Sequence, residues 1–213
     1  MKQNLMCVVF SALLCLGGAV MSNAETKKAG AQSAKPKTET AIFAGGCFWC
    51  MQPPYDRLKG VQETYVGYTG GSKNNPTYEE VSDGITGHAE AIEIIFDPSQ
   101  VSYAALLEVF WKNVDPTTPN RQFCDSGNQY RSAIFYADAV QKKLAEESKA
   151  KIEKSGVLKK PIVTELAAAS KFYRAEDYHQ KYYQKNPVRY KLYRYNCGRD
   201  KTLEQVWGSA PAH

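Results

Sequence analysis

The chain has 213 residues, of which 43% are hydrophobic and 23% charged, and its formal net charge is +5. That length is enough for one domain with a proper hydrophobic core, and the composition is that of an ordinary globular protein. The positive charge is modest and spread along the chain without a dense Lys/Arg cluster. The sequence therefore offers no reason to expect binding to nucleic acid.

The amino terminus has the pattern of a secretory signal peptide over residues 1–24. Lys2 supplies a positive charge, the run from Val8 to Val20 is apolar, and Ser22-Asn23-Ala24 has the small residues of a cleavage site. A membrane-anchoring helix is the alternative, but the apolar run is short for a bilayer and Gly17-Gly18 interrupts it. We therefore expect cleavage after Ala24, a periplasmic or secreted mature protein, and no stable insertion in the membrane.

Cleavage at that point would leave the mature chain with Cys47, Cys50, Cys124 and Cys197. In an oxidising compartment these cysteines could form structural disulfides, but the chain is not short and cysteine is sparse, so redox chemistry is an equal possibility. Residues 25–40 are rich in Lys, Ala, Ser and Thr without apolar periodicity. They predict a disordered lead-in to a globular domain over 41–213.

The domain begins with a predicted strand, a tight turn and a helix. Ala41-Ile42-Phe43-Ala44 is a β-prone run that ends at Gly45-Gly46, and a helical spacing of apolar residues follows as far as Gly60. Cys47 therefore falls at a helix N-terminus, where unpaired amide groups and the helix dipole favour an anion. We expect its thiol to ionise readily and to act as a nucleophile.

The tetrapeptide Cys47-Phe48-Trp49-Cys50 allows three interpretations. Two aromatic side chains beside a reactive thiol can form an apolar pocket, which suggests a substrate with a small apolar group next to the atom under attack. The Cys-x-x-Cys spacing also resembles a dithiol redox site. Alternatively, a cysteine in an apolar run is simply a small buried hydrophobe.

The rest of the domain alternates short strands and helices. We predict strands over 61–69, 88–96, 130–136 and 161–165, and helices over 77–81, 102–113, 137–154 and 176–185. Thr77 and Glu80 have the spacing of a capping box. From Asn186 the chain is rich in Tyr, Arg and Gly with little periodicity, so we expect a long irregular C-terminal segment with Cys197 on a flexible tail. Interspersed strands and helices in one domain indicate an α+β or mixed α/β fold.

Six sequence blocks occur in a specific order along the domain. They are Gly46-Cys47-Phe48-Trp49, Gly67-Tyr68-Thr69-Gly70-Gly71, Asn75-Pro76-Thr77-Tyr78, Gly87-His88-Ala89-Glu90-Ala91, Gln129-Tyr130-Arg131-Ser132 and Tyr178-His179-Gln180. Together they resemble the peptide methionine-S-sulfoxide reductases of the A class. The resemblance implies a ferredoxin-like αβ sandwich core with a mixed sheet, and reduction of methionine S-sulfoxide, free or in oxidised proteins, to methionine. It also implies no metal, no organic cofactor and a thioredoxin-like electron donor, and we expect a monomer.

The resemblance also implies a role for seven residues. Cys47 resembles the nucleophile, Phe48 and Trp49 the methyl-binding pocket, Glu90 the proton donor, Tyr78 and Tyr130 the hydroxyls that bind the sulfoxide oxygen, and Asp125 a polar partner of the substrate backbone or a site water. These residue types suit the reaction, because a sulfoxide oxygen leaves badly unless it is protonated. A carboxyl kept neutral by an apolar wall can supply that proton, and two phenols can stabilise the charge that develops on oxygen. Without the family pattern, each of these side chains would be an ordinary packing or turn residue.

Attack by Cys47 would leave a sulfenic acid, which a second thiol converts to a disulfide before the donor reduces it. Cys197 resembles the family's usual mobile resolving cysteine. Cys50 stands where many family members carry glycine and is within reach across one helical turn, and Cys124 is close enough to be considered. Of these we favour Cys197.

Two functions of other classes remain open. One is a general thiol-disulfide oxidoreductase that uses Cys47 and Cys50, although disulfide exchange does not need the acid and phenol blocks. The other is a non-enzymatic zinc module built from the four cysteines. A structural zinc site usually has two close pairs of ligands, whereas Cys124 and Cys197 each stand alone in the sequence.

Overall fold

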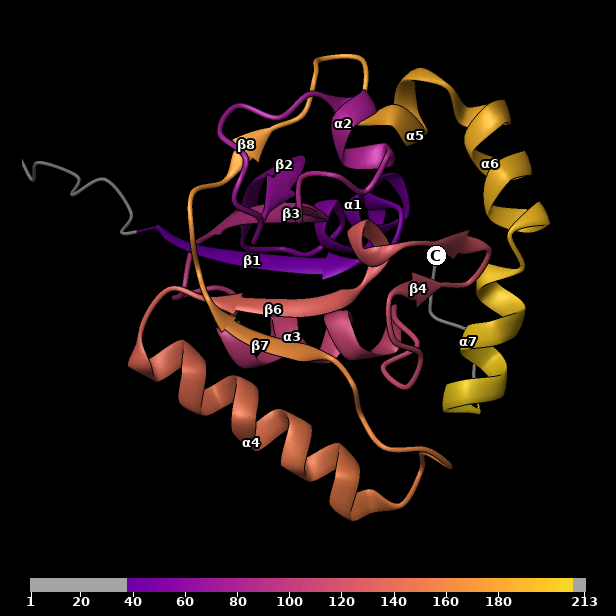
Figure 1. Cartoon of the computed structure of the whole chain (residues 1–213). Helices are drawn as coiled ribbons and strands as arrows, with labels where there is room; N and C mark the ends of the chain where they lie inside the picture. The colour runs from indigo at the N-terminus through magenta and orange to yellow at the C-terminus, as the bar shows by residue number, and fades with distance from the viewer. Residues whose placement is uncertain (1–37, 209–213) are drawn as a thin grey trace, which may run out of the picture. The chain divides into compact units, whose positions relative to one another are not determined.

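The computed structural model describes residues 38–208, so the predicted signal peptide 1–24 and the lead-in as far as residue 37 lie outside the described residues. The described chain forms an α+β fold around a six-stranded mixed sheet with the strand order β7-β6-β1-β3-β2-β8 (Figure 1). β6 and β7 pair in parallel, and the other neighbours pair antiparallel. The strands are β1 (Glu39–Gly45), β2 (Val61–Thr69), β3 (Ala89–Phe96), β6 (Ser132–Tyr136), β7 (Glu165–Ala168) and β8 (Tyr173–Arg174). The predicted α+β class is confirmed.

β1 lies inside the sheet and leads the chain towards the Cys47 turn. Its Ile42 pairs with a residue of β3 on one side and a residue of β6 on the other. Because side chains alternate along a strand, Ala41 and Phe43 enter one core while Ile42 and Ala44 enter a second core on the opposite face. Burial of both faces explains why this strand is apolar throughout.

Helices cover the face of the sheet to which Phe43 points. α1 (Phe48–Asp56) and α3 (Tyr103–Lys112) contribute buried side chains to this core, and α4 (Ala139–Ser155) packs along α3 and beside β6 and β7. Ser102 caps α3 by accepting a hydrogen bond from the Ala105 N–H at 3.1 Å. This layer of helices holds α1, and therefore the start of α1, firmly against the sheet.

α2 (Tyr78–Ser82) is a short helix in the connection between β2 and β3. The Thr77 hydroxyl accepts a hydrogen bond from the Glu80 N–H, and the Glu80 carboxylate accepts one from the Thr77 N–H. The predicted capping box is thus confirmed. It fixes the first turn of the helix, which is the turn that carries Tyr78.

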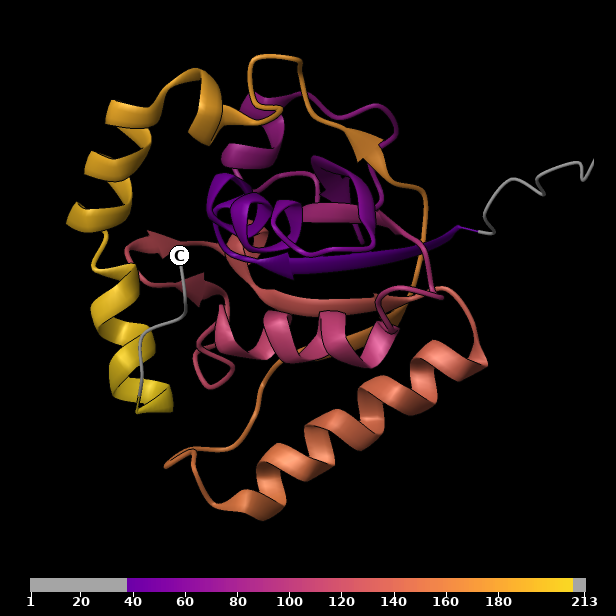
Figure 2. The same ribbon diagram turned by 180° about the vertical axis from the view of Figure 1, so that it is seen from behind.

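The C-terminal segment is helical, so the prediction of a long irregular segment was wrong. α5 (Tyr182–Lys185), α6 (Pro187–Asn196) and α7 (Arg199–Trp207) follow one another at the edge of the domain, beyond the end of β1 (Figures 1 and 2). Their buried positions include two arginines, Arg194 at 7% exposure and Arg199 at 1%. The apolar periodicity that indicates a helix is weak here because charged side chains occupy the inner face.

In α6 and α7, polar contacts of buried arginines take the place of apolar packing. Arg199 donates to the carbonyl oxygens of Gly45 at 3.2 Å and Asn113 at 2.6 Å, so the start of α7 is attached to the end of β1. Arg194 forms an ion pair with Asp200 across the junction of α6 and α7. Buried cations are tolerated when oxygen partners surround them, which allows a Tyr- and Arg-rich segment to pack.

Cys197 is not on a flexible tail either. It ends α6 and forms a disulfide with Cys124, at a sequence separation of 73. Cys124 lies in the turn of a small hairpin formed by β4 (Arg121–Gln122) and β5 (Asp125–Ser126). The disulfide therefore fastens this hairpin to the junction of α6 and α7.

Smaller differences concern the ends of predicted elements. Residues 39 and 40, predicted to end the lead-in, already pair with β3, and α1 ends at Asp56 rather than near Gly60. The strand predicted over 161–165 is β7, which begins where that prediction ends, and of the helix predicted over 176–185 only α5 is α-helical. Between residues 38 and 208, no helix has the length and apolar character that crossing a bilayer requires.

Candidate active site

A small cavity of about 90 Å³ opens where β1 ends and α1 begins. It is lined by Cys47, Phe48, Trp49, Tyr78, Glu90, Asp125, Tyr130 and Tyr193. The first seven of these side chains are the ones to which the family resemblance gives a role, and the structure brings all seven together. The eighth, from α6, was not anticipated.

The Cys47 side chain enters the cavity from the turn between β1 and α1. Cys47 is the N-cap of α1, as predicted, and its carbonyl oxygen accepts a hydrogen bond from the Cys50 N–H at 3.0 Å. Gly46, just before it, has φ = +77°, and a Cβ there would lie 2.4 Å from the Cβ of Gln122. Both the backbone angle and the space therefore require glycine at this turn.

The prediction that the Cys47 thiol ionises readily is wrong. The side chain is only 6% exposed, and burial raises its pKa well above the ordinary value. The neighbouring Cys50 and Glu90 act in the same direction, whereas the Tyr193 hydroxyl, within hydrogen-bonding reach of the sulfur, lowers the pKa. The loss of hydration, which disfavours the thiolate, outweighs the stabilisation that the N-terminus of α1 offers to a negative charge.

Of the two thiols, Cys50 is the one that ionises more easily. It lies one helical turn after Cys47 and is 1% exposed. The hydrogen bond that it accepts from the Cys47 thiol lowers the pKa of Cys50 to about 6, and the positive charges of Arg199 and Arg194 help to outweigh its burial. Both thiols are free. At neutral pH the pair therefore holds one proton and one negative charge.

Glu90 reaches the cavity from β3 and is 3% exposed. One of its carboxyl oxygens accepts a hydrogen bond from the Phe48 N–H at 3.0 Å, at the N-terminus of α1. Burial nevertheless raises the pKa of Glu90 to about 8, with the charges of Asp125 and Cys50 adding to the effect and the Phe48 amide opposing it. At neutral pH most of this carboxyl is protonated, so it can donate a proton.

Tyr78 and Tyr130 contribute two phenols to the same cavity. Burial, followed by the charge of Glu90, raises the pKa of both hydroxyls, so both stay protonated and can donate hydrogen bonds. The Tyr78 N–H donates to one carboxyl oxygen of Glu176 at 3.1 Å, and the Tyr68 hydroxyl donates to the other at 2.8 Å. Glu176 thus fixes the start of α2 from the C-terminal segment.

The aromatic wall of the cavity is built from both ends of the chain. The Trp49 indole N–H donates to Nδ1 of His179 at 3.0 Å, and Tyr182 stacks on the indole at a centroid distance of 3.9 Å. Tyr193 meets the same ring edge-on at 5.8 Å. Burial lowers the pKa of His179 to about 4, so the imidazole is neutral and Nδ1 can accept this hydrogen bond.

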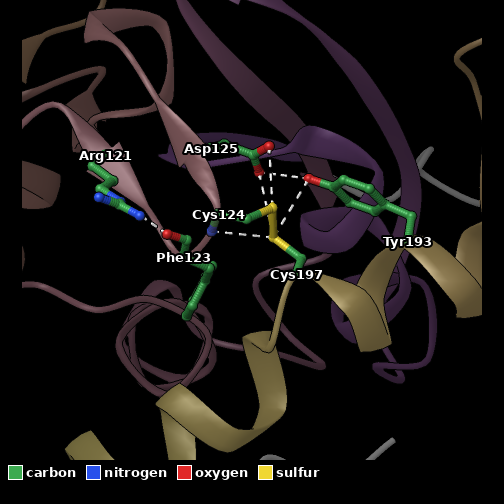
Figure 3. Close-up of a disulfide and its surroundings, with 6 residues drawn as sticks. All are labelled: Arg121, Phe123, Cys124, Asp125, Tyr193 and Cys197. Atoms are coloured by element: carbon green, nitrogen blue, oxygen red, sulfur yellow. Dashed lines mark hydrogen bonds between the residues drawn. A yellow bond between two sulfur atoms is a disulfide. The ribbon is translucent and has the colours of Figure 1, made fainter.

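The polar side of the cavity adjoins the disulfide (Figure 3). The Tyr193 hydroxyl donates to the Asp125 carboxylate, and the two sulfurs lie beside the same carboxylate, at 3.6 Å for Cys124 and 3.9 Å for Cys197. Within residues 38–208, one group of three metal-ligating side chains comes together, namely Cys124, Asp125 and Cys197. Both of its sulfurs are in the disulfide, which contradicts the hypothesis of a zinc module built from four thiolates.

The residues that the sequence reasoning missed belong to the C-terminal segment. Tyr193, Tyr182 and Glu176 are polar or aromatic side chains in a stretch without apolar periodicity, and His179 is in a family block but received no role from the resemblance. The signal that was available for His179 is its block, Tyr178-His179-Gln180. No comparable signal marks Tyr193, which is one of 14 tyrosines.

Two free buried thiols beside a neutral carboxyl and two phenols, on an α+β sheet domain, place this chain among the cysteine-based oxidoreductases. The family model described as peptide methionine sulfoxide reductase matches residues 39–211. The Bacillus licheniformis peptide methionine sulfoxide reductase MsrA is 52% identical over 172 residues, which are 81% of this chain and 95% of that protein. A Vibrio cholerae MsrA/MsrB protein is 45% identical over 198 residues, 93% of this chain and 52% of the relative. The chain therefore belongs to the peptide methionine sulfoxide reductase family, and within it to the MsrA enzymes.

Solved structures agree with this family. Methionine sulfoxide reductase A of Corynebacterium diphtheriae superposes with a TM-score of 0.63 at 37% identity, over 73% of this chain and 78% of that one. Mxr1 from Saccharomyces cerevisiae in its reduced form gives a TM-score of 0.66 at 32% identity, over 73% of this chain and 89% of the yeast protein. The α+β fold with its mixed sheet is thus shared with enzymes of this kind.

Proposed function

We propose that this enzyme reduces the S epimer of methionine sulfoxide, free or in oxidised proteins, by nucleophilic attack of Cys47. One observation carries the proposal: Glu90, Tyr78 and Tyr130 line the same small cavity as the Cys47 thiol. Disulfide exchange needs neither an acid nor phenols beside the thiol, whereas removal of oxygen from a sulfoxide needs a proton donor and stabilisation of the charge on oxygen.

In the proposed complex the methyl group of the substrate packs on Phe48 and Trp49 while its oxygen faces Glu90 and the two phenols. Phe48 is 1% exposed, and its ring contacts those of Tyr68 and His179, so it offers a rigid apolar surface. The sulfoxide sulfur is a stereocentre. Fixed places for methyl and oxygen leave one direction for the rest of the side chain, which supports selection of a single epimer.

Cys50 supplies the base in the first step. Its pKa of about 6 makes it a thiolate at neutral pH, and it takes the Cys47 proton as the Cys47 sulfur attacks the sulfoxide sulfur. Glu90 gives its proton to the sulfoxide oxygen, and the Tyr78 and Tyr130 hydroxyls stabilise that oxygen as hydrogen-bond donors. The products are methionine, a sulfenic acid on Cys47 and the carboxylate of Glu90.

Cys50 is also the resolving thiol in this proposal, in place of Cys197. Cys197 is bonded to Cys124, whereas Cys50 is free and its N–H donates to the Cys47 carbonyl within the first turn of α1. The Cys50 thiol attacks the sulfenic sulfur, the hydroxyl leaves as water, and a Cys47–Cys50 disulfide forms. The balance is one sulfoxide and two thiols converted to one methionine, one disulfide and one water.

We propose that a thioredoxin-like dithiol protein then reduces this disulfide, so that the enzyme repairs oxidative damage in repeated cycles. We also propose that the protein works outside the cytoplasm, after cleavage of its signal peptide. The Cys124–Cys197 disulfide supports this location, because such bonds persist in oxidising compartments. A monomer is sufficient, since the eight side chains that line the cavity come from one chain.

We assign the core of the domain to the ferredoxin-like class. The path β1-α1-β2-β3-α3-β6 alternates strands and helices, and its four strands are adjacent in the order β6-β1-β3-β2 with antiparallel neighbours. β7 and β8 extend this core at the two edges of the sheet. The assignment accounts for the position of the Cys47 turn at the end of an inner strand.

The decisive experiment compares the separate S and R epimers of a methionine sulfoxide peptide, with dithiothreitol as reductant, and insulin disulfide reduction in parallel. The proposal predicts methionine from the S epimer and no reduction of insulin. Insulin reduction without sulfoxide reduction would support the alternative, a general thiol-disulfide oxidoreductase that uses Cys47 and Cys50.

A further inference from the structure

Helix α6 carries three large hydrophobic side chains that face solvent. Val188, Leu192 and Tyr195 are 78%, 59% and 83% exposed, and their i, i+4, i+7 spacing places them on one face of the helix. Between residues 38 and 208, every other helix exposes at most one such side chain. These three residues form the α6 stripe. Neighbouring apolar side chains that stay exposed in this way mark a surface that binds a partner.

The inner face of α6 is already occupied by the domain. Arg194 is 7% exposed and forms an ion pair with Asp200, and Tyr193 lines the active-site cavity. Turning the stripe inwards would therefore displace side chains on which the site depends. The partner of the stripe has to come from outside the domain.

Positive charge flanks the stripe on both sides. Arg189 and Lys191 are exposed, and the helical repeat puts them on opposite sides of the stripe. The sequence from Tyr178 to Arg199 contains several Lys and Arg residues and no Asp or Glu. Charge complementarity therefore requires a partner that is negatively charged.

The position of α6 in the fold fits a flat partner. The helix lies at the outer edge of the domain, with the rest of the fold behind it in both views (Figures 1 and 2). At the surface of an anionic bilayer, apolar side chains enter the boundary between headgroups and acyl chains while Lys and Arg side chains stay among the headgroups. Tyr195 suits the same boundary, because its ring is apolar and its hydroxyl is polar.

A second copy of the chain fits this surface less well. Two stripes that faced each other would bring Arg189 and Lys191 of both copies together, and like charges repel. An anionic bilayer instead offers a negative partner to each of these cations.

We propose that α6 adsorbs to membranes of anionic phospholipid, with the stripe at the headgroup boundary and Arg189 and Lys191 against the negative headgroups. Such a helix lies in the plane of the interface and does not span the membrane. Because Tyr193 of the same helix lines the cavity, adsorption holds the cavity at a distance of about one helix diameter from the lipid. The adsorbed enzyme is thereby placed to act on oxidised methionines at a membrane surface.

The test is an amine-acetylation footprint of the full chain, read at single lysines by peptide mass spectrometry. The vesicles contain phosphatidylglycerol and phosphatidylcholine in equal amounts, and vesicles of phosphatidylcholine alone are the control. We expect the anionic vesicles to slow acetylation of Lys191 by about fivefold or more. Lys143 is exposed on α4, a helix away from α6 in both views (Figures 1 and 2), and should react at an unchanged rate. The readout reports contact at α6, whichever other part of the chain touches the vesicle.

Substitutions separate the contributions of the stripe and of the charge. The variant with Val188→Ser, Leu192→Ser and Tyr195→Ser should lose the protection of Lys191, because no apolar side chain then enters the bilayer. Arg189→Gln should raise the lipid concentration that gives half-maximal protection by about fivefold.

The matched control is Val140→Ser, which removes an exposed apolar side chain from α4 and should leave the protection of Lys191 unchanged. None of the substituted residues lines the active-site cavity. Each variant should therefore reduce free methionine S-sulfoxide at the rate of the unmodified enzyme, which also shows that it is folded. An inactive unmodified enzyme would refute the proposed function and leave the footprint interpretable.

Three outcomes would overturn the inference. One is an equal rate of Lys191 acetylation with and without anionic vesicles. Another is protection of Lys191 that rises with protein concentration in the absence of lipid, which would assign the stripe to a second copy of the chain. The third is protection by soluble polyglutamate but not by anionic vesicles, which would assign it to an acidic protein. If the triple variant fails to fold, the footprints of the unmodified enzyme and of Arg189→Gln still decide.

Discussion

The two ends of the domain build one cavity in different ways. The β1–α1 unit supplies both buried thiols from a short strand, a glycine turn and a helix, held by apolar packing on both faces of the sheet. The segment from Glu176 to Arg199 supplies hydrogen bonds, stacked rings and buried charges that orient groups carried by other elements. Reactive atoms can thus be placed by a local motif, while their orientation and ionisation depend on distant polar side chains.

The largest effect is expected from a substitution that removes the reactive sulfur atom of the first region. Cys47→Ser should lower methionine formation on the order of 10³-fold or more, because a serine hydroxyl is a far weaker nucleophile than a cysteine thiolate. A single-turnover assay with dabsylated methionine S-sulfoxide measures this loss. Cys50→Ser is the comparison variant: it keeps the nucleophile but loses the base, so it should still form one methionine per chain, more slowly than the unmodified enzyme, and then stop. Methionine formation by the Cys47 variant at more than a trace would remove Cys47 from its role.

Glu90→Gln should lower the single-turnover rate by about 10²-fold to 10³-fold at neutral pH, since glutamine keeps the shape but donates no acidic proton. The neutral carboxyl is the active form and its pKa is about 8, so the rate of the unmodified enzyme should fall as pH rises through about 8. It should also fall as pH drops below about 6, where the Cys50 thiolate becomes protonated. A rate profile of the Gln variant that keeps the upper limb would show that another group supplies the proton.

The contribution of the second region is tested at His179. His179→Leu leaves the Trp49 indole N–H without its acceptor, at a cost of about 1–3 kcal/mol and roughly tenfold or more in kcat/KM. His179→Asn offers an oxygen near the position of Nδ1 and should recover part of the loss. Because the imidazole is neutral, with a pKa of about 4, the fall in rate below about pH 6 belongs to Cys50 and should remain in both variants. Equal kcat/KM values for the Leu and Asn variants would argue against a positioning role.

The smallest expected effect concerns charge. Arg194→Gln removes one of the two positive charges that favour the Cys50 thiolate, so the pKa of Cys50 should rise from about 6. Titration of the ultraviolet thiolate absorbance measures the midpoint, and the rate should change by less than about tenfold. Arg189→Gln, at an exposed position of the same helix, is the matched control and should leave the midpoint in place. An unchanged midpoint in the Arg194 variant would contradict electrostatic control of Cys50.

The same contrast explains which parts of the molecule were predictable from sequence. Strand β1 and helix α3 bury apolar side chains at regular intervals, so periodicity located them, and the Thr77/Glu80 capping box located α2. In α6 and α7 the buried face includes Arg194 and Arg199, so the same criterion failed.

Within the candidate site, the seven side chains brought into the cavity lie in or beside the sequence blocks of the family. Tyr193 lies outside those blocks, and its place follows from the three-dimensional packing of α6. Which of the two thiols ionises could not be predicted from the sequence either. The helix end suggested an acidic Cys47, but the depth of burial reverses that effect and transfers the charge to Cys50.

The bond between Cys124 and Cys197 has a consequence for the order of events during synthesis. Its second sulfur follows the first by 73 residues and belongs to the last helices of the described chain. While the ribosome is still adding those helices, the earlier cysteines that remain after removal of the proposed signal peptide are those of the buried pair, and oxidation at that moment would join the wrong sulfurs. Correct maturation therefore requires either oxidation after release of the chain or an isomerase that reshuffles early mispairings.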